Sequence, residues 1–220
     1  MTIARIATFA FSGIDAVPVE VQVQISSGLP AFLLVGLPDK AVAESRERVR
    51  AALTGLGLSL PPKRVLVNLA PADILKEGSH FDLPIALALL AAMEIIPKED
   101  AAGYAALGEL ALDGSIMPVA GVLPAALGAS ARDLGLICPA AQGGEAAWAG
   151  QIIKAQKGEI AQMKAWLKDV GGLDQHAYDA MRHEMQNMMH MYTSSNPNVQ
   201  FVQQMLPHHG MAVTMTVPVL

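Results

Sequence analysis

Apolar and polar residues alternate most clearly between Val17 and Ile25, where valine or isoleucine takes every second position and Glu20 stands among the polar ones. Successive side chains of a strand point to opposite faces, so this alternation predicts a strand with one face in water. Two shorter apolar runs, at 31–35 and 65–69, predict strands that are buried more fully.

Helices are expected between and after these strands. Asp39 follows a proline and can cap a helix that runs to about Leu53, where glycines stop it. The nearly all-apolar segment 82–94 predicts a central helix, and 121–134 predicts a third helix after a hairpin around Asp113. Because the two kinds of element do not alternate regularly, we expect an α+β fold with a mixed sheet.

The use of methionine and histidine changes near Gly150. Residues 1–150 contain three Met and one His, whereas residues 151–220 contain nine Met and five His. Helix-stopping glycines at 171–172 and a helix-start signal at Pro197 divide the second part into three expected helices. We therefore predict two domains, 1–150 and 151–220, of which the second is an all-α, partial helical bundle.

Charge and composition argue against several classes of protein. The net charge is −5, and neither part has the basic excess of a self-sufficient nucleic-acid binder. The first residues lack a secretory signal and the longest apolar run is too short to span a bilayer, so we expect a cytoplasmic protein without a membrane partner. The single cysteine, Cys138, excludes an internal disulfide.

Six strings in the first part carry a family resemblance. They are Ser27-Gly-Leu-Pro-Ala, Val35-Gly-Leu-Pro-Asp, Glu47-Arg-Val-Arg-Ala-Ala, Val67-Asn-Leu-Ala-Pro-Ala-Asp, Lys76-Glu-Gly-Ser-His-Phe-Asp-Leu-Pro-Ile-Ala and Gly108-Glu-Leu-Ala-Leu-Asp-Gly. Together they look like the N-terminal domain of the ComM/YifB family, the magnesium-chelatase-like AAA+ proteins. The resemblance implies a fold similar to the proteolytic domain of Lon, placed before an ATP-driven motor that acts on DNA.

The catalytic features of such proteins are missing. The sequence has no glycine-rich loop ending in Gly-Lys-Ser or Gly-Lys-Thr to hold ATP phosphates. Alignment with Lon-like proteases puts Ala125 at the catalytic lysine and places the serine position near Phe81. Ser79 and His80 suggest a hydrolase, but neighbouring residues need not face each other, and a polar loop before a helix is the alternative. We therefore expect binding rather than catalysis.

A basic surface is the candidate contact site of the first part. It comprises Arg46, Arg48 and Arg50 on the first predicted helix and Lys63 and Arg64 before a strand. A solvated helix face with ion pairs four residues apart explains the arginines without any partner. The alternative is a contact with the missing motor, with a partner subunit or, with less support, with DNA.

Two strings in the second part carry another resemblance. Ile152-Ile-Lys-Ala-Gln-Lys-Gly-Glu-Ile-Ala-Gln-Met-Lys-Ala-Trp-Leu and Met205-Leu-Pro-His-His-Gly-Met-Ala-Val-Thr-Met look like the Met/His-rich helical family typified by CopM. That resemblance implies a ferritin-like bundle that binds copper. The strings occur in reversed order, so the segment resembles the end of one repeat joined to the start of the next.

Helical geometry selects the copper ligands. At about 100° per residue, one helix face of roughly a third of the circumference carries four side chains, and His209 lies at its edge. The four are Met205, His208, Met211 and Met215. Thioether sulfur favours Cu(I), and imidazole accepts both oxidation states. Bundle packing with satisfied histidines is the alternative.

On the preceding expected helix, methionines and histidines lie on different faces. Met181, Met185 and Met188 form a stripe that we interpret as core. His183 and His190 lie nearly opposite and are either surface residues or ligands that face a neighbouring chain.

The sequence therefore favours a non-enzymatic binding protein, a motor-less ComM-like domain fused to a partial copper-binding segment that can self-associate. One alternative is an accessory or DNA-contacting subunit of an AAA+ ATPase supplied in trans. Another is a fusion or truncation without function.

Overall fold

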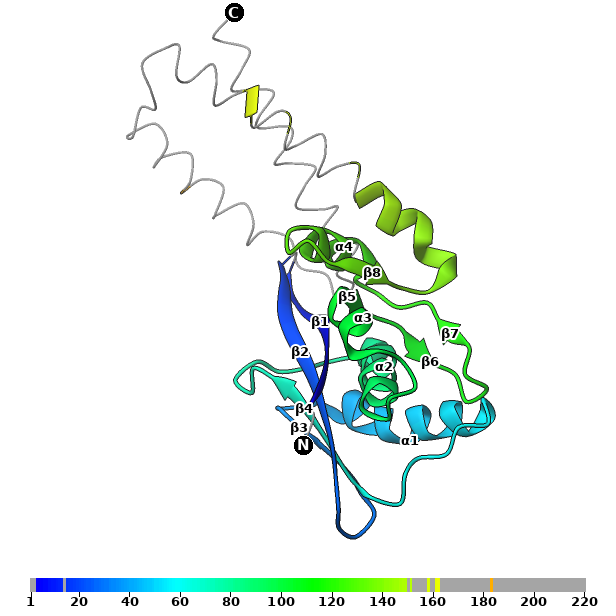
Figure 1. The fold of residues 1–220 in the computed structure, drawn as a ribbon. Helices are drawn as coiled ribbons and strands as arrows, with labels where there is room; N and C mark the ends of the chain where they lie inside the picture. Colours follow the sequence, from blue (N-terminus) through cyan, green and yellow to red (C-terminus); the bar gives the residue numbers. More distant parts are fainter. Residues whose placement is uncertain are drawn as a thin grey trace, which may run out of the picture.

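The computed structural model describes residues 3–13, 15–149, 151, 158, 161–162 and 183. Its main feature is a six-stranded mixed sheet (Figure 1). The strands, in spatial order, are β3 (Ala31–Val35), β4 (Arg64–Ala70), β2 (Asp15–Ser26), β1 (Ala4–Ser12), β5 (Tyr104–Ala106) and β8 (Gly135–Ile137). β2 is antiparallel to β1 and β4, whereas the pairs β3–β4, β1–β5 and β5–β8 are parallel. The predicted α+β class with a mixed sheet is confirmed for this part of the chain.

The alternating segment forms β2 as predicted. Val19, Val21 and Val23 are buried, while the glutamate and glutamines between them are half-buried on the other face. The runs at 31–35 and 65–69 form β3 and most of β4, but the prediction that they are buried more fully is wrong. β4 alternates between buried and half-buried residues as β2 does, and in β3 only Phe32 is buried while Val35 is exposed. The expected hairpin is also present, as β6 (Glu109–Leu110) paired with β7 (Ile116–Met117).

Among the described residues four bounded α-helices accompany the sheet, and residues 143–149 are also helical. They are α1 (Lys40–Gly55), α2 (Asp82–Ala92), the short α3 (Lys98–Ala102) and α4 (Val122–Ser130). The Asp39 carboxylate accepts a hydrogen bond from the Val42 N–H at 2.7 Å, which is the predicted cap of α1. One 3₁₀ turn (Ser79–Phe81) leads into α2, and another (Ala140–Gln142) follows β8.

Two helices are shorter than predicted, and their backbone explains where they end. Glu94 after α2 and Asp133 after α4 have φ values of 61° and 58°, in the left-handed region. The following N–H groups, of Ile95 and Leu134, bond back to carbonyls five residues earlier, at 2.9 and 3.0 Å. This is the Schellman arrangement that closes a helix, here formed without glycine.

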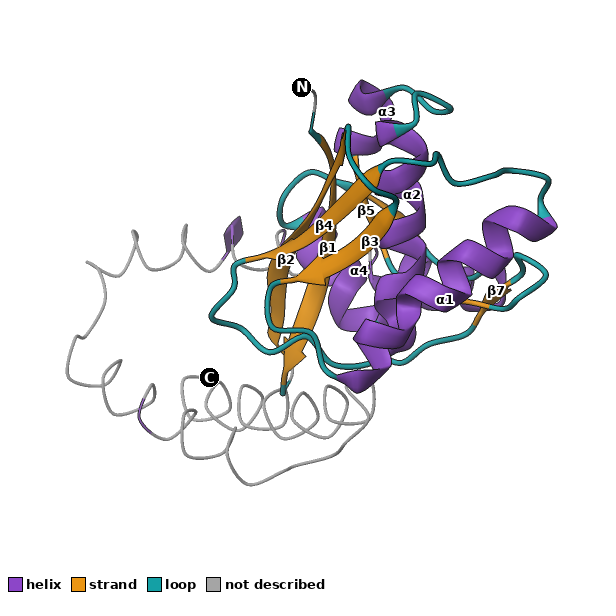
Figure 2. Cartoon of the chain, turned by 90° about the horizontal axis from the view of Figure 1, so that it is seen from below, coloured by secondary structure: helices purple, strands orange, loops and turns teal. Residues whose placement is uncertain are grey.

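The helices cover both faces of the sheet, as the side chains of β1 show. Ile6 and Ala10 point into the core beneath α1 and α2, whereas Phe9 points to the opposite face, where it packs with Val122 and Ala125 of α4. Figure 2 shows α1 and α2 together on one side of the strands. β1 is thus buried on both faces in the middle of the sheet.

The predicted helical bundle at 151–220 falls almost wholly outside the described residues. None of the helices in the described ranges combines the length and apolar character that a membrane crossing requires.

Candidate functional site

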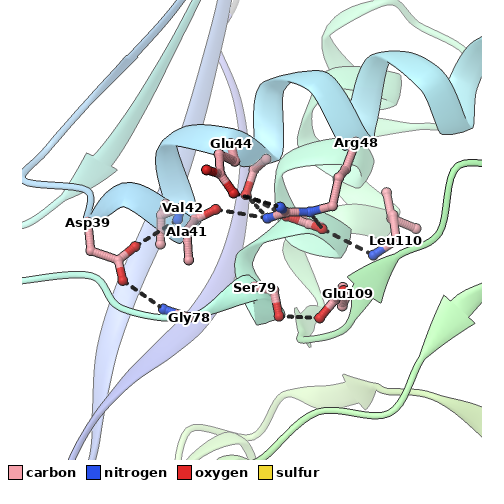
Figure 3. A network of polar contacts seen from close by, with 11 residues as sticks. Asp39, Ala41, Val42, Glu44, Arg48, Gly78, Ser79, Glu109 and Leu110 are labelled. Atoms are coloured by element: carbon pink, nitrogen blue, oxygen red, sulfur yellow. Dashed lines mark hydrogen bonds and ion pairs between the residues drawn. The ribbon is translucent and has the colours of Figure 1, made fainter.

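The buried carboxylate of Asp82, at the start of α2, joins three elements. It is fully buried and accepts hydrogen bonds from the Ser45 hydroxyl, from the Leu110 N–H at 3.1 Å and from the Arg48 guanidinium (Figure 3). Arg48 donates through Nε at 2.6 Å and through Nη2 at 3.0 Å, and Nη2 also reaches the Ala41 carbonyl at 2.8 Å. The hydrogen bond to Asp82 is the main cause that raises the pKa of Arg48. One carboxylate therefore ties α1, α2 and β6 together.

A second aspartate fixes the loop before α2. Besides capping α1, Asp39 accepts a hydrogen bond from the Gly78 N–H at 3.4 Å (Figure 3). The backbone of Lys76 exchanges hydrogen bonds with the same turn, donating to the Leu37 carbonyl at 3.1 Å and accepting from the Asp39 N–H at 2.8 Å. The Lys76 side chain is buried, and its ammonium group donates to the carbonyls of Pro71 and Ile74. The loop is held at both its backbone and its side chains.

Ser79 and His80, which suggested a hydrolase, bond to different partners. The Ser79 hydroxyl donates to the Glu109 carboxylate (Figure 3), whereas His80 Nε2 lies 2.9 Å from the carbonyl oxygen of Phe9. The His80 ring packs against Phe81 and Phe11, with ring centroids 4.2 and 5.2 Å away. Burial lowers the pKa of His80 to about 4, so the ring is neutral at pH 7. These contacts agree with the interpretation as a polar loop before a helix.

The two positions aligned with a protease dyad lie inside the protein. Phe81 is fully buried in the core beneath α1 and α2, and Ala125 is fully buried in the separate core beneath α4. A site that used these positions would have to open two cores on opposite faces of the sheet.

A pocket of about 410 Å³ opens beside the loop. Its wall includes Phe11 of β1, the loop residues Glu77 to His80, and Val119 in the segment before α4. The Val119 backbone is fixed from the other side, because the Gln142 side chain bonds to both its N–H and its carbonyl at 2.8 Å. Because hydrogen bonds fix its walls on both sides, we take this pocket as a candidate binding site in the described part of the chain.

The family of this chain follows from a comparison with known proteins. The family model described as subunit ChlI of Mg-chelatase matches residues 21–142, which is more than half of the chain. The chain belongs to this family. Three similar proteins support this assignment, and two of them are YifB and ComM themselves.

YifB of Salmonella typhimurium, described as uncharacterized, is 45% identical over 126 residues, which are 57% of this chain and 25% of that protein. The competence protein ComM of Haemophilus influenzae is 45% identical over 136 residues, or 61% of this chain and 27% of ComM. An uncharacterized protein of Mycobacterium bovis is 47% identical over 133 residues, or 60% and 26% of the two chains. The chain thus spans about a quarter of the length of these relatives.

The polar contacts of this ChlI-family domain join strings that are far apart in sequence. Asp39, Ser45 and Arg48 come from one region, Gly78 to Asp82 from a second, and Glu109 and Leu110 from a third. Sequence reasoning placed Asp82, Ser45 and Glu109 in no site. The signal that points to them is their position inside or beside the strings that carry the resemblance.

The five basic residues of the candidate contact site are not equivalent. Arg48 is turned inward to Asp82, whereas Arg46 is exposed on α1 and pairs with Glu47 at 2.8 Å. Arg50 and Lys63 are also exposed, and both line a second pocket of about 370 Å³ between α1 and the start of β4. Arg64 is exposed at the first position of β4. The structure therefore brings Arg50 and Lys63 together and separates Arg48 from them.

The predicted copper ligands fall outside the described residues, except for His183, which is exposed. In the described ranges, no group of three or more His, Cys, Asp or Glu side chains is placed to hold a metal ion.

Proposed function

We propose that the described domain is a non-enzymatic interaction module of the ComM type, which works beside an AAA+ motor carried by a separate chain. The observation that supports it most is that the polar side chains of the family strings bond to one another. Both carboxylate oxygens of Asp82, for example, accept hydrogen bonds from Ser45, Arg48 or the Leu110 backbone. Side chains that bond to one another in this way stabilise the fold. Binding would then use the exposed surface of the domain.

The relatives suggest how to test a motor partner. The portion of ComM that is not aligned with this chain can be purified alone and mixed with the full chain. Under this proposal the two proteins co-elute, and the chain alone hydrolyses no ATP with or without DNA. ATP turnover by the chain alone would contradict the non-enzymatic role, and the absence of a complex would contradict the motor partner.

The exposed basic residues supply a finer test. Arg50→Glu combined with Lys63→Glu reverses the charge beside the second pocket without touching the Asp82 contacts. If this surface binds the motor, the double variant weakens the complex at least tenfold, whereas Arg132→Glu on the far side of the sheet, beyond α4, leaves the affinity unchanged. Equal affinity of both variants would assign binding to another surface. An electrophoretic shift with duplex DNA tests the alternative, a DNA contact, with the same pair.

We propose copper binding by the segment 151–220 as a second function. Its support is the sequence, in which Met205, His208, Met211 and Met215 share one face of the expected helix and His209 lies at its edge. Cu(I) titrated into the full chain should then bind at least tenfold more tightly than to a variant with alanine at Met205, His208 and Met215. Equal affinity of the two proteins would refute the site. The same titration with His183→Ala and His190→Ala tests ligands that face a neighbouring chain, because their effect would depend on protein concentration.

A further inference from the structure

The pocket beside the loop presents a hydrogen-bond acceptor that the fold does not use. His80 lines this pocket and is only 6% exposed. The atom opposite its Nε2 is the Phe9 carbonyl oxygen, which can only accept, so Nε2 carries the hydrogen and donates. The ring is neutral, so Nδ1 is left with a lone pair and has no hydrogen-bond partner among the described residues.

The loop leaves this nitrogen uncovered on the side of Gly78. A Cβ at Gly78 would lie 3.2 Å from His80 Nδ1, so any side chain there would cover it. Gly78 has a φ of 95°, a conformation that favours glycine, and its N–H is held by Asp39. The same residue that shapes the loop therefore keeps the acceptor open. Among the described residues the only side-chain N or O atom that is both buried and unpaired is Thr8 Oγ1, so His80 Nδ1 is open to the pocket and can accept a hydrogen bond from a group that enters it.

The charges around the pocket are negative. Glu77 lines it and is exposed, and Ser79 beside it is bonded to the Glu109 carboxylate. Asp39 and Asp82 also act on His80, each favouring positive charge at the imidazole. The nearest cationic side chain in the loop, Lys76, directs its ammonium group away to the Pro71 and Ile74 carbonyls. The remaining walls, Ala10, Phe11, Leu75 and residues 118–120, carry no charge.

We propose that this pocket binds a cationic hydrogen-bond donor at the end of an aliphatic chain, of the kind that an arginine or lysine side chain presents. One N–H donates to His80 Nδ1, the positive charge faces Glu77, and the aliphatic stem packs against Phe11 and Val119. A volume of about 410 Å³ is sufficient for such a group. This site is distinct from the basic surface at Arg50 and Lys63, so failure to bind a motor leaves the proposal standing.

The test uses the full chain labelled with ¹⁵N-histidine and three probes. N-acetyl-arginine amide is the expected ligand, N-acetyl-citrulline amide is its neutral counterpart of nearly equal shape, and N-acetyl-glutamate amide carries the opposite charge. The arginine probe should move the His80 Nδ1 resonance in a saturable titration and bind at least tenfold more tightly than the other two. No movement of this resonance, or equal affinities for arginine and citrulline, would overturn the proposal.

Two variants separate binding from folding. His80→Gln retains an N–H for the Phe9 carbonyl but has no acceptor at the Nδ1 position, because its amide oxygen lies elsewhere, so the arginine probe should bind at least tenfold more weakly. Glu77→Gln changes only an exposed side chain and should weaken binding several-fold, while the matched variant Glu99→Gln on α3 should bind as the wild type does. If His80→Gln does not fold, the Glu77 and Glu99 pair decides, and wild-type affinity in Glu77→Gln overturns the proposal.

Discussion

Removing the Asp82 carboxylate should destabilise the domain more than any exposed charge change. Asp82→Ala leaves the Arg48 guanidinium, whose side chain is only 20% exposed, without its main partner, and it leaves the Leu110 N–H unbonded. Breaking a buried ion pair from one side costs about 3–5 kcal/mol, a large share of the roughly 5–15 kcal/mol by which domains are stable. Asp82→Asn should be nearly as harmful, because its amide group would face the donors of Arg48 and Leu110.

The assay is urea unfolding of the full chain, followed by far-ultraviolet circular dichroism. The matched control is Arg46→Ala, which removes an exposed pair with Glu47 and should change the free energy of unfolding by less than about 0.5 kcal/mol. Arg48→Ala should resemble Asp82→Ala, and the double variant should cost less than the sum of both, because the two side chains form one interaction. If the free energy of unfolding of Asp82→Ala lies within about 1 kcal/mol of that of the control, this carboxylate is not the central link between α1, α2 and β6.

Two further predictions concern the loop and the strands. Burial lowers the pKa of His80 from 6.5 to about 4, so the unfolded chain binds more protons between these values and stability should fall as the pH drops from 7 to 4, by on the order of 3 kcal/mol. Urea unfolding at pH 7 and 4.5 should show a smaller loss in His80→Gln, and an equal loss would contradict this origin. Gly36→Ala should destabilise by at least about 3 kcal/mol, because its Cβ would overlap the Leu69 carbonyl, whereas Gly57→Ala, also at positive φ but in open space, should cost about 1–2 kcal/mol. Thermal melts compare the two, and equal losses would refute the overlap.

The sequence predicted those elements whose two faces differ. β2 alternates because one face is buried, and α1 shows both a cap at Asp39 and a glycine-rich end. β1 escaped prediction because Ile6 is buried on one face and Phe9 on the other, which removes the alternation. β5 and β8 have three residues each, too few for any period to appear.

The candidate site was predicted less well, because its contacts are long-range. Nothing near Arg48 in sequence distinguishes it from Arg46 and Arg50, since its partner Asp82 is 34 residues away. The pocket was likewise hidden, because Phe11, His80 and Val119 meet only after three separate segments have packed. In contrast, the expectation that Ser79 and His80 need not face each other followed from local geometry and agrees with their contacts.

The central position of β1 has a consequence for how this domain can be dissected. The family match begins at residue 21, but the strand at Ala4–Ser12 lies between β2 and β5 and contributes Ile6 and Phe9, each 1% exposed, to two cores. A fragment cut at the start of the family match would lose an inner strand, so β2 and β5 would be left with unpaired edges and would tend to pair with other chains. The limits of the family match and the limits of the folding unit are therefore different, and expression boundaries should follow the second.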